Sequence, residues 1–158
     1  MFITSGPTET PVTGRDPLGN LSEPLQALAQ FYKALNGRDL AMMEQNWVAS
    51  PDAAMDNPLG GITRGWPNIR AVYQRLFAVK GSYRFEFWDY TLHRTQDVFF
   101  VVGRERGRLE LESGALDLAI RTTRLFTREG SGWRQLHHHG SIDDPQMLSK
   151  YQKLVLGR

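Results

Sequence analysis

One segment near the C-terminal end constrains the fold of this chain more than any other. Residues 120–141 contain two runs in which apolar and polar residues alternate, separated by the glycine-rich stretch Glu129-Gly130-Ser131-Gly132. Alternation with a period of two is typical of strands, and a short glycine-containing turn between two such runs predicts an antiparallel hairpin. Neighbours on a strand point to opposite faces, so His137, His138 and His139 must divide between the two sides of a sheet.

Helical patterns precede this hairpin, and further strands join them to it. Apolar residues recur at helical spacing over 22–36, 40–47 and 66–80, with Asp39 as the N-cap of the second helix and a left-handed cap at Asn36-Gly37 after the first. Alternating runs then predict strands over 83–93, 97–108, 116–127 and 133–142, after a short strand at 53–56. A short helix is expected from Pro145. Three helices followed by an antiparallel sheet predict an α+β fold.

The chain of 158 residues fits one domain. Residues 1–20 hold three prolines and three glycines without any apolar period, so we expect a flexible N-terminal tail. Residues 21–158 then form a single domain that ends in the short C-terminal helix.

Composition excludes several classes of function. The chain has no cysteine, which rules out disulfides, thiolate metal sites and a cysteine nucleophile. It has no apolar run long enough to span a membrane and no signal peptide, so we expect a cytoplasmic protein. The net charge is only +2 although the pI is 9.1. Arg104, Arg106 and Arg108 alternate with acidic residues, which we interpret as a solvated strand face, and we expect no nucleic-acid partner.

The order of elements and several separated motifs resemble the nuclear transport factor 2-like superfamily, which includes the SnoaL-like and ketosteroid isomerase-like proteins. The resemblance covers residues 21–142. It rests on FYKALNGRDL at 31–40, DNPLG at 56–60, GWPNIR at 65–70, TRLF at 123–126 and HHHGS at 137–141. The final hairpin is most similar to the association domain of calcium/calmodulin-dependent protein kinase II and its small bacterial relatives. The resemblance implies a cone, in which a curved antiparallel sheet wraps the helices, encloses a cavity and often forms a dimer through its outer face.

The resemblance does not extend to the catalytic residues of the ketosteroid isomerases. Those enzymes need a carboxylate base and acidic donors that stabilise an oxyanion. The matching positions hold Phe31 for the tyrosine donor, Asn57 for the base, and Thr123 or Arg124 for the donor acid. A neutral amide cannot act as a base near pH 7, so we expect no steroid-type isomerisation. Asp56 could replace the base by a shift of one residue, but a loop carboxylate at a strand end is the simpler interpretation.

Arg124 is the first candidate for the cavity wall. It corresponds to a cavity-lining arginine of the kinase association domain, and strand parity places it on one face with Ile120, Thr122 and Phe126. An enclosed arginine needs either a carboxylate partner or a ligand, and the sequence leaves both open.

The histidine strand supplies the second candidate. Strand parity divides it into Leu136, His138 and Gly140 on one face, and Trp133, Gln135, His137 and His139 on the other. If the alignment with the association domain holds, the first set faces the cavity. That domain has a second cavity arginine where this chain has Gly140, so the cavity is expected to be less selective for anions or to admit a larger ligand. A β-bulge would reverse the assignment.

Aromatic residues and metal ligands complete the candidates. Trp66 opens the third helix near the cavity mouth of this fold and is the preferred aromatic pocket residue, followed by Trp47. Alternate histidines on a strand can bind zinc, but a third ligand is needed and the only other histidine is His93, so we predict no metal site.

Together these features predict a cone-shaped domain, homodimeric through its outer sheet face, that binds a small, partly polar organic ligand. Asn57, Arg124 and His138 are the expected polar contacts, with Trp47 and Trp66 as apolar walls. In an enzyme, His138 would be the acid or base, and the reaction would be that of an isomerase, cyclase or hydratase-lyase without cofactor. The alternative is a non-catalytic association module whose cavity is filled by its own side chains.

Overall fold

A curved sheet of seven strands and the helices packed against it make up the structure, a computed structural model that describes residues 1–157. The helices are α1 (Glu23–Gly37), α2 (Leu40–Asn46), α3 (Trp66–Ala78) and α4 (Pro145–Leu156), with a 3₁₀ turn at Leu18–Asn20. The strands are β1 (Ile3–Thr8), β2 (Ala54–Asp56), β3 (Thr63–Arg64), β4 (Gly81–Arg94), β5 (Val98–Leu111), β6 (Gly114–Glu129) and β7 (Gly132–Ser141). The predicted α+β architecture is therefore confirmed.

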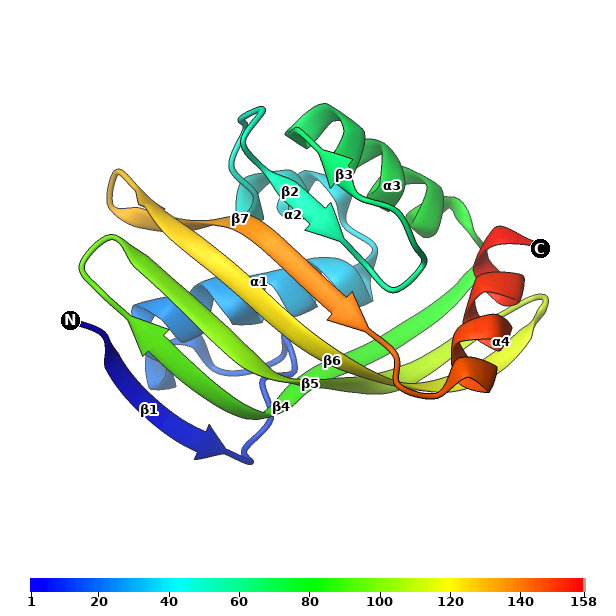
Figure 1. Cartoon of the computed structure of the whole chain (residues 1–158), viewed down its shortest axis with the longest axis horizontal. Coiled ribbons are helices and arrows are strands. Elements are labelled where there is room, and N and C mark those ends of the chain that lie inside the picture. The colour runs from blue at the N-terminus through cyan, green and yellow to red at the C-terminus, as the bar shows by residue number, and fades with distance from the viewer. Residues whose placement is uncertain (158) are drawn as a thin grey trace.

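The sheet has the strand order β1-β4-β5-β6-β7-β2-β3, and Figure 1 shows its long central strands bending around α1. All neighbouring strands are antiparallel except β2 and β7, which run parallel. In the same view, α4 lies at the right-hand end of the molecule, opposite to β1 and next to the hairpin between β5 and β6.

The helices form where apolar periodicity and capping residues predict them. Leu28, Phe31 and Tyr32 of α1 are buried against the sheet, and the Tyr32 ring stacks on that of Phe87 with centroids 6.1 Å apart. Asp39 caps α2 as predicted, because its carboxylate accepts a 2.9 Å hydrogen bond from the backbone nitrogen of Met42. The left-handed residue after α1 is Arg38, with φ of 51°, rather than the predicted Asn36-Gly37.

The inner face of β5 follows strict alternation. Phe99, Val101 and Leu109 are buried, while Arg104 and Arg106 between them are exposed. Gly103 takes one inward position where a Cβ would lie 2.6 Å from that of Tyr90. The register between β4 and β5 shifts opposite this point, between Trp88 and Thr91. The absence of a side chain at Gly103 thus lets β4 and β5 approach closely at the register shift, where the sheet bends.

A β-bulge in β7 changes which of its side chains point to the inner face of the sheet. Gln135 pairs with Phe126 and His137 pairs with Leu125, so Leu136 is an extra residue without a partner on β6. The parity prediction is wrong across this point, because Gln135 and His138 are both buried on the inner face. His138 itself points inward, as the alignment with the association domain implies.

The N-terminal segment belongs to the sheet, which corrects the expectation of a flexible tail over residues 1–20. β1 pairs with the end of β4, from Ile3 opposite Arg94 to Thr8 opposite Tyr90. Val12 is only 2% exposed and exchanges two backbone hydrogen bonds with Phe87 of β4. Composition missed this segment because backbone pairing along a sheet edge needs few apolar side chains. None of the helices in residues 1–157 is long and apolar enough to cross a membrane.

Candidate functional site

A cavity of about 60 Å³ lies inside the cone, between α1, α3, the inner face of the sheet and α4. Its lining is mostly apolar and aromatic, with four polar or charged groups on β5, β6, β7 and the loop after β2. The lining residues are Phe31, Leu35, Met55, Asn57, Pro58, Tyr73, Leu76, Tyr83, Phe85, Glu105, Leu109, Ile120, Arg124, His138, Tyr151 and Val155. A space of this size has room for a few water molecules.

Arg124 and Glu105 form a buried ion pair on the cavity wall. A guanidinium nitrogen of Arg124 lies 2.9 Å from Oε2 of Glu105, and the Tyr32 hydroxyl donates a 2.7 Å hydrogen bond to the same oxygen. Within residues 1–157 no hydrogen bond reaches Oε1 of Glu105. Since Glu105 lines the cavity, Oε1 is the oxygen available to a molecule inside it. Burial, and then the nearby carboxylate of Glu105, raise the pKa of Tyr32 well above its usual range, so this hydroxyl stays a donor.

The remaining contacts of Arg124 fix its orientation. Its other terminal nitrogen donates a 2.9 Å hydrogen bond to Oε1 of Gln135, and the guanidinium lies 3.6 Å from the centre of the Phe31 ring. The amide nitrogen of Gln135 in turn lies 3.3 Å from Oδ1 of Asn46 on α2. Of the two roles that the sequence leaves open for Arg124, the structure supplies the carboxylate partner.

The inward position of Glu105 is not among the predictions from the sequence, although the alternation of side chains along β5 indicates it. We interpreted it as one acid of a solvated face shared with Arg104, Arg106 and Arg108. Those arginines occupy even positions, which point outward, whereas position 105 is odd and shares the inner face with Val101 and Leu109. Glu105 is 6% exposed.

His138 is the polar residue of the cavity whose hydrogen-bonding groups are not satisfied. It is 6% exposed, and neither ring nitrogen has a hydrogen-bond partner in the described chain. Burial, followed by the positive charge of neighbouring Arg124, lowers the pKa of His138 well below its usual range. The imidazole is therefore neutral near pH 7, with one donor and one acceptor facing the inside of the cone.

Tyrosines from two helices also line the cavity. Burial raises the pKa of Tyr73 on α3 to about 12, and burial likewise raises the pKa of Tyr151 on α4. Both hydroxyls remain protonated at neutral pH. Tyr151 and Val155 of α4 line the cavity although no residue of this helix is fully buried, so α4 closes the cone without being part of its core.

Asn57 and Gly140 lie where the alignment implies, with different consequences. Asn57 lines the cavity, and its Oδ1 accepts a 3.0 Å hydrogen bond from the backbone of Leu59, which leaves its amide nitrogen free to donate. A Cβ at Gly140 would lie 3.0 Å from Pro58 and 3.1 Å from Nε2 of His138. These groups take up the space at Gly140, so the glycine does not enlarge the cavity as expected.

The predicted aromatic walls lie outside the cavity lining. Trp47 is 1% exposed and stacks on Trp66, with ring centroids 6.4 Å apart, and the Trp66 indole donates a 3.2 Å hydrogen bond to Glu44. Phe31 and Tyr73 form the aromatic walls instead.

The other two histidines of β7 point to the outer face, together with Asp56. Nδ1 of His139 lies 2.8 Å from one carboxylate oxygen of Asp56, and Nε2 of His137 lies 3.6 Å from the other. Asp56 is therefore turned away from the cavity, where a substitute base would need to be. Within residues 1–157, no group of three histidine or acidic side chains has an arrangement that could hold a metal ion.

Comparison with known proteins identifies the family and the fold of the chain. The family model of the SnoaL-like domain matches residues 25–145. No curated protein matches the sequence.

Solved structures share the fold at low sequence identity. A proposed calcium/calmodulin-dependent protein kinase type II association domain from Thiobacillus denitrificans is 24% identical with a TM-score of 0.65, over 82% of this chain and 100% of that one. A proposed NTF2-like dehydratase from Streptomyces avermitilis is 19% identical with a TM-score of 0.70, over 80% and 98% of the chains. A proposed ketosteroid isomerase from Shewanella frigidimarina is 19% identical with a TM-score of 0.63, over 76% and 95%. The chain shares its fold with a nuclear transport factor 2-like protein of Salmonella enterica, and it belongs to the SnoaL-like domain family.

Proposed function

We propose that this protein binds a small, partly polar organic molecule in the cone cavity, through His138, Asn57 and the free oxygen of Glu105. The observation that carries the proposal is the buried imidazole of His138, whose two ring nitrogens have no partner. An unsatisfied polar group in an apolar interior costs about 1–3 kcal/mol, and a ligand that accepts from one nitrogen and donates to the other removes that cost.

The same groups supply acid–base chemistry. Glu105 is held by Arg124 and Tyr32 through one oxygen, and its other oxygen can take a proton from a bound molecule. Glu105, once protonated, can return the same proton to another atom of the molecule, and the N–H of neutral His138 can donate a hydrogen bond to an oxygen on which negative charge develops. A carboxylate base and a neutral donor in one mostly apolar cavity suit an isomerase, cyclase or hydratase-lyase that uses no cofactor. The similarity to a proposed dehydratase and a proposed ketosteroid isomerase supports this class.

The small volume of the cavity limits the size of the ligand that it can hold without rearrangement. Cavities that enclose drug-sized ligands measure roughly 300–1,000 Å³, whereas this one measures about 60 Å³. A ligand larger than a few heavy atoms needs lining side chains to move, and Tyr151 and Val155 belong to α4, a helix with no fully buried residue.

Native mass spectrometry of the purified protein tests the proposal. We expect a bound small molecule that dissociates under denaturing conditions and is absent from His138→Phe, in which an apolar ring fills the polar corner. His139→Phe is the matched control, because the side chain of His139 is 56% exposed on the outer face and the change leaves the cavity intact. Equal occupancy in both variants, with unchanged circular dichroism, would contradict the proposed site.

The non-catalytic association module is the second candidate. The small volume of the cavity and the similarity to a proposed association domain favour it. In that case no small molecule co-purifies, no fragment raises the melting temperature, and light scattering detects an oligomer whose assembly is unaffected by His138→Phe.

A further inference from the structure

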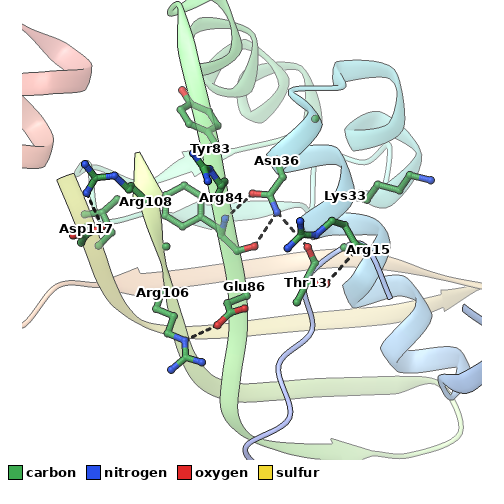
Figure 2. Close-up of a pocket in the computed structure, with 15 residues that line it drawn as sticks. Thr13, Arg15, Lys33, Asn36, Tyr83, Arg84, Glu86, Arg106, Arg108 and Asp117 are labelled. Carbon is green, nitrogen blue, oxygen red and sulfur yellow. Dashed lines mark hydrogen bonds and ion pairs between the residues drawn. The ribbon is translucent and has the colours of Figure 1, made fainter. Parts of the chain in front are cut away.

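A second concave site lies outside the cone, where the N-terminal segment, the end of α1 and the strands β4 to β6 meet. It is an open groove of about 700 Å³, more than ten times the volume of the cone cavity. Tyr83 and Phe85 line both, so these two side chains form the wall between groove and cavity. Figure 2 shows the groove with residues of α1 and the N-terminal segment on one side and residues of the sheet on the other.

The floor of the groove is apolar. Tyr83, Phe85 and Leu118 lie there, each less than 9% exposed. Gly107 lets β4 approach closely, since a Cβ at this position would lie only 2.2 Å from the carbonyl oxygen of Arg84 and 2.6 Å from the Phe85 ring. The floor is therefore formed by the aromatic side chains of β4 together with Leu118 of β6.

One wall of the groove is fixed by hydrogen bonds. The carboxylate of Asp16 accepts from the backbone nitrogens of Thr13 and Gly14, at 2.8 and 3.0 Å. Asn36 donates to the carbonyl oxygens of Thr13 and Phe85 and accepts a 2.7 Å hydrogen bond from the Phe85 nitrogen. These bonds join the N-terminal segment, α1 and β4, so Arg15 is carried on an ordered loop.

The charges of the groove do not balance. On the sheet side, Arg106 pairs with Glu86 at 2.6 Å, and Arg108 pairs with Glu110 at 2.7 Å and with Asp117 at 3.1 Å. On the opposite side, Arg15 and Lys33 line the groove and take part in no ion pair within residues 1–157. In Figure 2 the Arg15 side chain extends toward the groove, whereas the Lys33 side chain extends from α1 away from it.

We propose that this groove binds an organic anion that combines an apolar, preferably aromatic, body with a carboxylate group. The body would lie on Tyr83, Phe85 and Leu118, and the carboxylate would pair with Arg15, while Lys33 adds positive charge at the edge of the groove. Two unpaired cations beside a short groove suit a compact anion and not a long polyanion, which would need a continuous basic stripe. The site is independent of the ligand proposed for the cone.

Two matched probes, 4-phenylbutyrate and 4-phenylbutanol, test the proposal, because they share an apolar body and differ in charge. Binding is followed by two-dimensional NMR of the ¹⁵N-labelled full chain. Gly14, Gly37 and Gly107 line the groove, while Gly140 lies beside His138, so glycine amide signals report on each site separately. We expect the acid to shift the three groove glycines and the alcohol to bind several-fold more weakly.

Replacing the two free cations tests the charge requirement. Arg15→Ala with Lys33→Ala should weaken phenylbutyrate binding about three- to tenfold, as expected for two exposed charge pairs, and added salt should weaken binding to the wild type. Arg94→Ala, an exposed arginine outside the groove, is the matched control and should leave affinity unchanged. Equal binding of acid and alcohol, or an unchanged affinity of the double variant, would overturn the proposal. Shifts confined to Gly140 would also overturn it, while supporting a ligand in the cone.

Discussion

Oε2 of Glu105 accepts hydrogen bonds from two side chains at once, at 2.7 Å from the Tyr32 hydroxyl and 2.9 Å from the Arg124 guanidinium. The two donors come from α1 and β6, so a single carboxylate oxygen on β5 links the helix to two strands. The pair is almost fully buried, with side-chain exposures of 1% for Arg124 and 8% for Glu105. Removal of either partner therefore leaves a charge in the interior.

Glu105→Gln should lower the free energy of unfolding by about 3–5 kcal/mol, since it leaves the Arg124 charge without a counter-ion. Urea denaturation followed by tryptophan fluorescence measures the change. Glu110→Gln is the matched control, because Glu110 pairs with Arg108 on the exposed face, and its stability should stay close to that of the wild type. A loss in Glu105→Gln no larger than in the control would show that the buried pair contributes nothing.

His138 should make the protein less stable in mild acid. Its pKa is lowered in the folded state, whereas the unfolded chain has a histidine pKa of about 6.5, so below that pH the unfolded state binds the extra proton. Stability attributable to His138 is complete above about pH 6.5. It falls by up to about 1.4 kcal/mol per pH unit as the pH decreases toward the folded-state pKa.

Urea denaturation at pH 7.5, 6.0 and 5.0 checks this behaviour. His138→Leu should reduce the pH dependence by about one proton. Parallel curves for the wild type and His138→Leu would mean that the buried imidazole does not titrate on unfolding.

Val12→Ala should destabilise the protein by about 1–3 kcal/mol, because two buried methyl groups are lost from a residue that is 2% exposed. Ile62→Ala is the control, since Ile62 is 61% exposed and its truncation should have little effect. The melting temperatures of the two variants, compared with that of the wild type, test this prediction. If both melt like the wild type, the N-terminal segment is not docked in solution.

α4 should open more readily than the rest of the fold. No residue of α4 is fully buried: the helix packs on the core only through partly buried side chains such as Tyr151 and Val155, and Gln152 donates a 3.2 Å hydrogen bond to the carbonyl of Leu59. Hydrogen–deuterium exchange should give faster uptake in peptides of α4 than in peptides of α1. Protection of α4 equal to that of α1 would exclude this helix as the route into the cone.

The outer face of the sheet is the surface on which we predict a homodimer. His137 and His139 point outward there, and Val102 is exposed on the same side of the sheet. Light scattering at micromolar concentration should give the mass of a dimer, and Val102→Glu should shift it toward the monomer. A monomeric wild type would reject the predicted interface.

The long elements and the inward position of Arg124 could be predicted from the sequence because they depend on local periodicity. Strand parity holds along β6, where no residue is inserted, and it fails along β7, where Leu136 is an extra residue. Nothing in the composition of that stretch marks a bulge, because the bulge depends on pairing with β6. The position of the bulge decides whether Gln135 or His137 points toward the helices.

The rest of the site depends on contacts between distant segments. Tyr32 and Arg124 reach Glu105 from 73 and 19 residues away in the sequence, so their convergence needs the folded sheet. Tyr151 closes the cavity from a C-terminal helix that could be predicted as an element, but its docking position could not. Edge pairing of β1 was missed for the same reason, since it depends on backbone groups that every residue carries.

The glycines of β5 restrict how a SnoaL-like chain with this backbone can diverge. Glu105 is flanked on the inner face by Gly103 and Gly107, where an added Cβ would lie 2.6 Å from Tyr90 and 2.2 Å from the backbone of Arg84. The carboxylate cannot move one inward position along the strand by substitution, because neither neighbouring position admits a side chain. Descendants of this chain that acquire a new ligand must therefore keep the acid in place and vary the opposite walls, on α3, β7 and α4.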